Sequence, residues 1–239
     1  MKRARTIAAA MGVGVIASAA PAFAGQQVYT YAVLHPTYGE IGTLTHTIDR
    51  SPETTRIDAR LRIAVKWLGI VVYREETDTT EIMSGDRLVS LESASYKDGR
   101  HVEVHGEAQG DRFVVNATAG SFTGPATVVP SNPWVLKRTG EETMVYTDTG
   151  RIIDVRVSGG DHETVSVNGA SVSARHFVVT GDKRQEVWLD NRKIPVMFRT
   201  IENGTPIDFV LRRSAVASNP TAVAALKRSA LAQLEKGDK

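Results

Sequence analysis

The sequence contains no cysteine among its 239 residues. This absence excludes disulfides, thiolate metal ligands, a cysteine nucleophile and the cysteine that carries the lipid of a bacterial lipoprotein. The chain is nevertheless long enough to bury a core without disulfides or a structural metal. We therefore expect a protein that needs no cofactor.

An excess of charge of one sign is also missing, since 29 basic residues stand against 27 acidic ones. Lys2, Arg3 and Arg5 lie in the first few residues, and without them the formal net charge falls from +2 to −1. Such a chain has no electrostatic basis for binding nucleic acid. It also lacks the block of basic residues that stable attachment to anionic lipid requires.

No apolar run is long enough to cross a membrane. Residues 6–20 are apolar or small, but Pro21 ends this run before the roughly 20 residues that a span needs. Basic residues precede the run and a small-residue triplet ending at Ala24 follows it, an order typical of a signal peptide. We expect residues 1–24 to be cleaved before Gly25, which favours export to the periplasm over a retained membrane anchor. The mature chain should have no transmembrane span.

What the sequence does contain is alternation of apolar and polar residues. From Arg56 to Trp67 every second residue is apolar, which predicts one long strand with an apolar face, which we call the dry face, and a polar face. Turn dipeptides that favour two-residue hairpin loops separate many such runs. They are Asp98-Gly99, Asn168-Gly169 and Asn203-Gly204. Most neighbouring strands should therefore be antiparallel.

Two segments depart from this alternation. Residues 119–134 are rich in glycine and proline, and we interpret them as a crossing between two halves of one sheet. Near the end, Asn219 and Pro220 begin a helical pattern that predicts a helix at about 219–235. Such a helix could cover the sheet or bind a partner. We expect residues 25–239 to form a single domain.

About a dozen strands with one dry face must either form two packed sheets or curl around a shared interior. The unusual strand length and the low aromatic content, 6%, favour curling. The predicted fold is all-β: a strongly curved antiparallel sheet, an open barrel or clam, with a C-terminal helix.

A charged run at residues 74–81 predicts the register of one hairpin. If three residues form the turn near Leu68, Arg62 faces Glu76 and Arg60 faces Asp78. We interpret these pairs as a register lock and not as a carboxylate active site. The same register places Trp67 opposite Val71, and Val65 opposite Tyr73, on the dry face near the hairpin end.

No motif for nucleophilic catalysis is present in the sequence. The nearest approach is at 120–124, where Ser121 stands one place too early for a nucleophile elbow. His46 is an even number of residues from Glu40 and would share its strand face. Both His46 and His176 are typical of lone, hydrogen-bonded histidines on strands. We assign no catalytic residue.

One row of side chains could contact a metal ion. His101, Glu103 and His105 alternate along a strand and therefore share a face. The two histidines are too far apart to share one ion, and a catalytic zinc normally needs three protein ligands. A solvated polar face is the favoured interpretation, so we predict no metal site.

Three long segments together resemble a known family. They are YTYAVLHPTYGEIGTLTHTIDR at 29–50, IAVKWLGIVVYREETDTTEIMSGDRLVSLESASYKDGRHVEV at 63–104 and VTGDKRQEVWLDNRKIPVMFRTIENGTPIDFVLRR at 179–213. Within them, the order and spacing of GEIG at 39–42, SGDRL at 84–88 and EVWLD at 186–190 carry the resemblance. HPTY at 35–38 departs from the family pattern, where a shorter Asp-Gly-type turn is expected.

The family is the uncharacterised exported domain of unknown function 6134 (DUF6134), which is itself similar to the wider family DUF3108. The resemblance implies a curved sheet similar to that of periplasmic lipoprotein carriers. It implies no activity and no catalytic residues that could be carried over.

These observations favour a non-enzymatic periplasmic module that binds an apolar or lipid-like ligand or an envelope protein partner. The candidate ligand-binding residues are Trp67, Tyr73, Trp134 and Trp188. One alternative is a hydrolase-like periplasmic enzyme whose polar site has no sequence signature. Another is a structural interaction protein, which would have a filled interior and an exposed apolar patch.

Overall fold

The computed structural model describes residues 25–136 and 138–217. The predicted signal peptide at 1–24 and the predicted helix at 219–235 lie outside the described residues, so both stay predictions. Within the described part, strands account for nearly all of the regular structure.

The first half of the chain forms eight strands in sequence. They are β1 (Gln26–His35), β2 (Gly39–Arg50), β3 (Thr55–Trp67), β4 (Ile70–Ser84), β5 (Arg87–Lys97), β6 (Arg100–Gln109), β7 (Arg112–Ala117) and β8 (Gly120–Pro125).

The second half begins with a two-residue strand and one short 3-10 helix, η1. The elements are β9 (Val129–Pro130), η1 (Pro133–Val135), β10 (Gly140–Val145), β11 (Ile152–Val167), β12 (Ala170–Thr180), β13 (Arg184–Leu189), β14 (Pro195–Glu202) and β15 (Thr205–Ala217).

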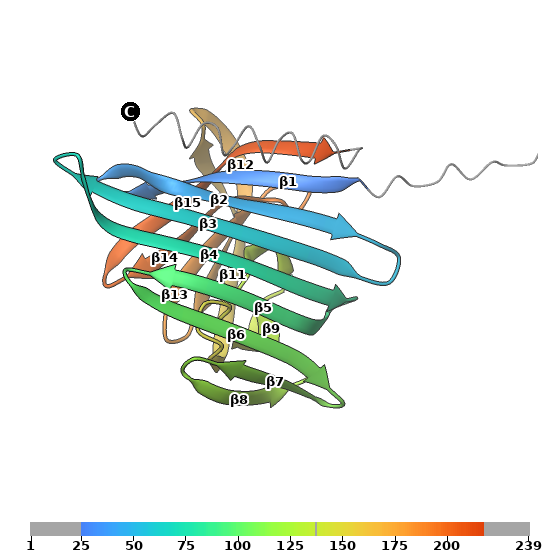
Figure 1. Ribbon diagram of the computed structural model, residues 1–239. Helices are drawn as coiled ribbons and strands as arrows, with labels where there is room; N and C mark the ends of the chain where they lie inside the picture. Colours follow the sequence, from blue (N-terminus) through green and yellow to red (C-terminus); the bar gives the residue numbers. More distant parts are fainter. Residues whose placement is uncertain (1–24, 137, 218–239) are drawn as a thin grey trace, which may run out of the picture.

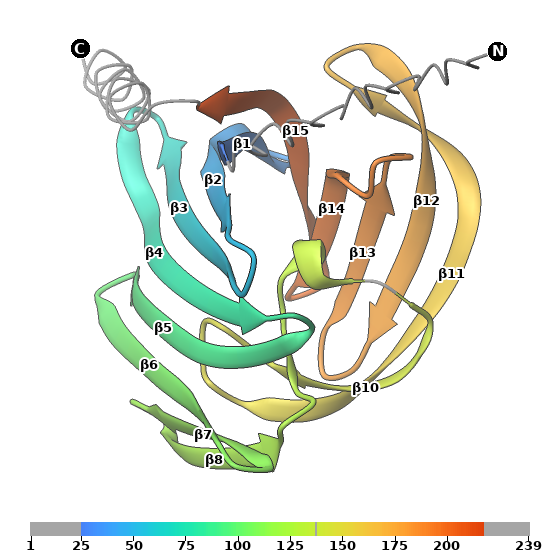
Figure 2. The ribbon, with the colours of Figure 1, turned by 90° about the vertical axis from the view of Figure 1, so that its right-hand side faces the viewer.

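All fifteen strands belong to one sheet, in the order β8-β7-β6-β5-β4-β3-β2-β1-β15-β14-β13-β12-β11-β10-β9. Every described pair is antiparallel except β9 with β10. The first and last strands pair in the middle of the sheet. The sheet curls so that edge strand β8 contacts β11 and edge strand β9 contacts β5 (Figures 1 and 2). Within residues 25–136 and 138–217, no strand pairing between these edges closes the sheet. The predicted curved antiparallel sheet is confirmed.

The apolar face of the sheet lines an interior that we call the lumen. On β3 the buried residues Ile57, Ile63 and Val65 alternate with exposed or half-buried ones, as the sequence pattern predicts. They belong to the largest buried apolar cluster, which contains side chains from β1, β2, β3 and β10–β15. A second cluster, containing Leu88, Leu91 and Phe113, fills the lumen beneath β4–β7.

The charged register of the β3–β4 hairpin agrees with the sequence-based prediction. Arg60 pairs with Asp78 and Arg62 with Glu76, and an Arg60 Nε to Asp78 Oδ1 distance of 2.9 Å closes the first ion pair. Arg62 reaches Asp78 at 2.7 Å as well as Glu76 at 3.7 Å. These exposed pairs are each worth a few tenths of a kcal/mol to about 1 kcal/mol, enough to favour one register.

The predicted placement of Trp67 is wrong. Leu68 and Gly69 form a two-residue turn with positive φ angles of 50° and 81°, and β4 has a bulge at Val72, opposite Val65 and Lys66. Trp67 therefore pairs with Ile70 and not with Val71, and it is 61% exposed. The extra residue, Val72, lies in β4, so Trp67 keeps the strand face of Val65. Trp67 is exposed because the tip extends past the last pairs with β2 and β5, at Ile63 and Glu75.

The three predicted turn dipeptides all close hairpins. Asp98-Gly99, Asn168-Gly169 and Asn203-Gly204 have positive φ at both residues, as a two-residue primed turn requires. The segment predicted as a crossing does join the two halves of the sheet, because it leads from edge strand β8 to edge strand β9. It also contributes β8 itself, which the sequence pattern did not indicate.

Candidate functional site

A short segment of the chain, residues 131–136, lies across the lumen, and we call it the crossing segment (Figure 2). It contains η1. Asn132 caps this turn, because its side chain accepts a hydrogen bond from the Trp134 backbone N–H at 3.0 Å, and Pro133 occupies the first helical position. The local sequence Asn-Pro-Trp thus forms a compact turn that presents its side chains to the surrounding strands.

Glu81 on β4 anchors one side of the crossing segment. Asn132 Nδ2 donates a hydrogen bond to Glu81 Oε2 at 2.8 Å, and Glu81 is only 2% exposed. Burial raises the pKa of Glu81 to about 7, while the hydrogen bond from Asn132 acts in the opposite direction. In the described part of the chain, no ion pair stabilises the charged form of this carboxyl group. Because its pKa is about 7, its neutral and charged forms are both populated near neutral pH.

His46 on β2 anchors the other side. The Trp134 indole Nε1 donates to His46 Nδ1 at 3.1 Å, and the Trp134 ring packs against Tyr29 with centroids 4.3 Å apart. Because an indole N–H can only donate, His46 must accept at Nδ1 and carry its proton on Nε2. Burial lowers the pKa of His46 to about 3, which is consistent with this neutral form.

The crossing segment divides the lumen into two cavities. The first has a volume of about 540 Å³ and the second about 440 Å³. Residues that line both cavities form the partition between them; they are Ser131, Asn132, Pro133, Gln185, Phe198 and Thr200. Both volumes fall within the range of about 300–1,000 Å³ that is typical of small-molecule sites.

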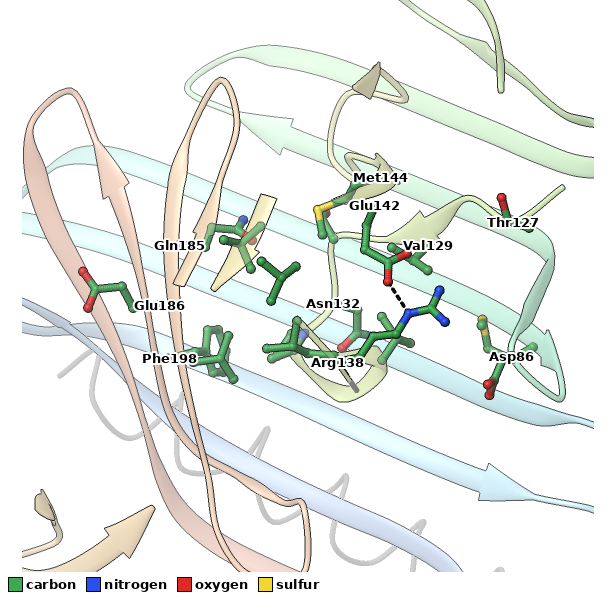
Figure 3. Close-up of a pocket in the computed structure, with 18 of the residues that line it drawn as sticks. Asp86, Thr127, Val129, Asn132, Arg138, Glu142, Met144, Gln185, Glu186 and Phe198 are labelled. Atoms are coloured by element: carbon green, nitrogen blue, oxygen red, sulfur yellow. Dashed lines mark hydrogen bonds and ion pairs between the residues drawn. The ribbon is translucent and has the colours of Figure 1, made fainter. Parts of the chain in front are cut away.

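The first cavity is lined mainly by apolar side chains (Figure 3). Its walls include Met83, Val129, Val135, Leu136, Met144, Val157, Val179, Val187 and Phe198. Charged residues lie at one end, where the exposed Arg138 donates from Nε to the half-buried Glu142 Oε1 at 2.8 Å, and Asp86 and Arg87 lie nearby. The cavity therefore offers an apolar chamber with a mixed-charge rim.

The second cavity has polar side chains along one wall. On β4 the side chains of Thr77, Thr79 and Glu81 share its lumen face, and the two threonines hydrogen-bond to Ser95 and Ser93 of β5 at 3.0 and 3.1 Å. Ile63, Val65, Ile207 and Phe209 supply its apolar part.

Charged side chains gather at the far end of this second cavity. Lys183 Nζ lies 3.2 Å from Glu202 Oε1 and 3.8 Å from Asp148 Oδ2. Burial lowers the pKa of Lys183, but the two carboxylates outweigh it and the pKa is raised overall. The Tyr73 hydroxyl donates to Glu75 Oε2 at 2.6 Å, and burial together with this contact raises the pKa of Tyr73. This end of the cavity suits polar groups.

The four sequence-predicted ligand-binding residues lie in four different environments. Tyr73 lines the second cavity, and Trp134 is part of the crossing segment. Trp67 is exposed at the tip of the β3–β4 hairpin. Trp188 is buried, but it lies on the outer face of β13, since its neighbour Val187 lines the first cavity. The structure thus brings only Tyr73 and Trp134 to the lumen.

Trp188 belongs to a network on the outer face of the sheet. Its ring stacks on His176 with centroids 4.4 Å apart, and its Nε1 donates to Glu163 Oε2 at 2.8 Å. His176 lies 3.0 Å from Glu163 and 2.9 Å from Glu186. Because Glu163 is on β11 beyond its bulge, these contacts hold the far half of the β11–β12 hairpin against β13.

The row of His101, Glu103 and His105 lies on the exposed side of β6. His101 Nδ1 is 3.9 Å from Glu103, and His105 contacts Glu92 of β5. Nowhere in residues 25–136 and 138–217 do three or more His, Asp or Glu side chains come together in a way that could hold a metal ion. Ser121 is exposed and hydrogen-bonds to Asn116 at 2.8 Å. Among these same residues, no helix is long and apolar enough to cross a membrane.

Sequence reasoning missed Glu81 and Asn132 as members of the site. Glu81 ended the charged run that we interpreted as a register lock, but it lies an odd number of residues from Glu76 and Asp78 and so points to the opposite face of β4. Its position was the available signal, because an even number of residues separates it from the lumen-facing Tyr73 and Met83. Nothing local identified Asn132, whose partner is 51 residues away.

Comparison with known proteins supports the family and the fold. The sequence model of the family described as Domain of unknown function (DUF6134) matches residues 37–212. No curated protein matches the sequence. The chain is similar to the crystal structure of a beta-barrel-like protein of domain of unknown function DUF1849 from Brucella abortus, with a TM-score of 0.60 and 11% identity. The likeness covers 82% of this chain and 99% of that chain, and at this identity it concerns the fold alone.

Proposed function

The chain belongs to the family Domain of unknown function (DUF6134), whose description assigns no activity, and we propose that it binds an apolar, lipid-like ligand inside its curled sheet. The observation that carries this proposal is the first cavity, a chamber of about 540 Å³ walled by aliphatic side chains, Met83, Met144 and Phe198. Burying apolar surface in such a chamber is favourable by roughly 25 cal/mol per Å² removed from water. The mixed-charge rim at Arg138 and Glu142 would hold the polar end of an amphipathic ligand.

The buried titratable groups favour binding over catalysis. A shifted carboxyl group in a cavity is a common sign of an enzyme. Here, however, Glu81 and His46 each hydrogen-bond to the crossing segment, through Asn132 and Trp134. Both shifted groups therefore have a structural partner, and their role is to hold the partition of the lumen in place.

The compartment is part of the same proposal. The basic, apolar and small-residue order of residues 1–24 supports export and cleavage before Gly25. We therefore place the binding function in the periplasm, where a carrier for apolar molecules would shield them from water. Native mass spectrometry of protein released from its own cells by osmotic shock tests both points: a mass beginning at Gly25, and an additional bound mass that organic solvent extracts.

A cavity-filling pair of variants tests the ligand site directly. Val179 lines the first cavity, whereas the adjacent Val178 points to the other face of β12. We expect Val179→Phe to weaken binding of the fluorescent fatty acid cis-parinaric acid by about tenfold or more, because the added ring occupies the ligand volume. Val178→Phe makes the same chemical change outside the lumen and should bind normally.

Two results would contradict the proposal. One is mature protein that neither carries an extractable ligand nor binds the fatty acid. The other is equal binding by the two valine variants, provided that circular dichroism shows both to be folded, since binding would then take place outside the first cavity.

A further inference from the structure

The exposed large apolar side chains of the described residues all lie at one end of the sheet. They are Tyr38, Trp67, Leu68, Ile70, Val71, Val72 and Tyr96. Five of them follow almost without interruption along the tip of the β3–β4 hairpin, with exposed fractions between 40% at Val71 and 81% at Leu68. A soluble domain rarely gathers its exposed apolar residues in this way unless the patch binds something.

The hairpin tip extends beyond the strands that flank it (Figure 1). The pairing of β3 with β2 ends at Ile63, and the pairing of β4 with β5 begins at Glu75. The four residues of β3 after Ile63 therefore pair only within the hairpin, and they carry its tip about 13 Å past the last pair with β2. Among the described strands, none covers the sides of this two-stranded ribbon.

Apolar side chains project from both faces of this ribbon and from its apex. Trp67 and Ile70 face each other across the strands, Val71 is paired with Lys66, and Leu68 is at the turn. A flat protein surface could cover only one of these faces. A medium that surrounds the tip would bury all of them.

The size and charge of the tip also favour lipid over a protein partner. A stable protein interface buries about 800 Å² on each partner, from some 20–30 residues, whereas the tip offers five apolar residues. Lys66 and Arg74 flank them, at the level where phosphate headgroups would lie if the tip entered a bilayer. Tryptophan and tyrosine are the residues that favour the membrane interface, and Tyr38 and Tyr96 lie further back at the same end of the sheet.

We propose that the β3–β4 hairpin tip inserts into the interface of a phospholipid membrane and docks the protein there. The net charge of the chain beyond residue 24 is −1, so the attachment is weak and reversible and depends on apolar insertion more than on electrostatic attraction. The second cavity extends to the same end of the sheet, since Val65 and Tyr73 in the base of this hairpin line it. This proposal does not depend on the nature of the ligand in the lumen.

Vesicles of phosphatidylethanolamine and phosphatidylglycerol test the proposal with the mature chain. We expect the protein to co-sediment with the vesicles, and the double variant Leu68→Asp/Ile70→Asp to lose at least about tenfold in partitioning, because two charges would have to enter the interface. The double variant Thr164→Asp/Ser171→Asp adds the same charge at exposed positions of the β11–β12 hairpin and should bind like the wild type.

Tryptophan fluorescence provides a readout at the tip itself. Of the three tryptophans, Trp134 and Trp188 are shielded by the fold, and Trp67 is exposed. Vesicles should shift the emission to shorter wavelength and protect it from iodide, and Trp67→Phe should abolish that change while binding continues.

The proposal is overturned if the mature chain does not bind vesicles, or if the tip aspartates leave binding unchanged. It is also overturned if iodide cannot quench Trp67 in the absence of lipid, because a second copy or another part of the chain would then cover the tip. Size-exclusion chromatography would distinguish those two occupants.

Discussion

At the scale of single residues, Glu81 and His46 couple the stability of the fold to pH in opposite directions. Burial raises the pKa of Glu81 to about 7 in the folded state, against about 4.3 in an unfolded chain. Between these values the folded state binds more protons, so stability falls as pH rises. Burial lowers the pKa of His46 to about 3, against about 6.5 unfolded, so stability rises with pH between those values.

The two contributions overlap between about pH 4.3 and 6.5 and oppose each other there. We expect Glu81→Gln to remove the Glu81 contribution while it keeps an oxygen that can accept from Asn132. The free energy of unfolding of the variant, relative to wild type, should then increase by on the order of 3 kcal/mol from about pH 4 to about pH 8.

Urea denaturation at a series of pH values measures this difference. Glu107→Gln replaces an exposed carboxylate on β6 and should give a profile parallel to that of the wild type. A Glu81→Gln profile that also runs parallel to the wild type would mean that the Glu81 pKa is not shifted by burial.

At the scale of elements, a bulge in β11 determines where the β11–β12 hairpin goes. The register shifts between Gly159 and Asp161, and Gly159 and Gly160 have φ angles of 91° and 104°. Beyond this point the hairpin packs on the outer face of β13–β15, where Val167, Ala174, Trp188 and Val196 form a separate buried cluster. The bulge thus converts a long strand pair into a cover for part of the sheet.

We expect Gly159→Ala to be more destabilising than Gly169→Ala in the turn of the same hairpin. Both positions have positive φ, which costs an L-residue about 1 kcal/mol. A Cβ at Gly159 would in addition lie 2.5 Å from the His176 carbonyl oxygen, whereas a Cβ at Gly169 would meet nothing within 4 Å. The extra loss at Gly159 should be about 1–3 kcal/mol in chemical denaturation. Equal losses for the two variants would show that the bulge region adapts to the added methyl group.

At the scale of the whole molecule, the open seam determines where the sheet is least protected. Among the described strands, β8 and β9 each have a partner on one side only, whereas β1 and β15 pair with each other and with β2 and β14. Edge strands exchange their amide hydrogens sooner because fewer bonds must open. In hydrogen-exchange mass spectrometry we expect β8 to exchange far faster than β1 and β15. Protection of β8 equal to that of β1 would indicate that another part of the chain, or a second copy, closes the seam.

The sequence alone determined the features that depend on neighbours along the chain. Period-two alternation identified strand 56–67 within one residue of its observed bounds, and the Asn-Gly and Asp-Gly dipeptides located three hairpin turns. The charged pairs of Arg60 and Arg62 indicated the correct register for the body of the β3–β4 hairpin. Such interactions act across one turn or one strand pair, so the pattern of a single hairpin is enough to predict them.

Only the tertiary structure decided what the curled sheet encloses. Asn132 reaches Glu81 across 51 residues, and Trp134 reaches His46 across 88. Whether a strand's dry face meets packed side chains, a cavity or a crossing segment depends on how far the whole sheet bends, and no local pattern encodes that bend. A turn of two residues instead of three likewise changed the pairing of Trp67, which lies on the exposed tip and not in the lumen. The candidate site arises from these long-range contacts, because strands from both halves of the sheet line its cavities.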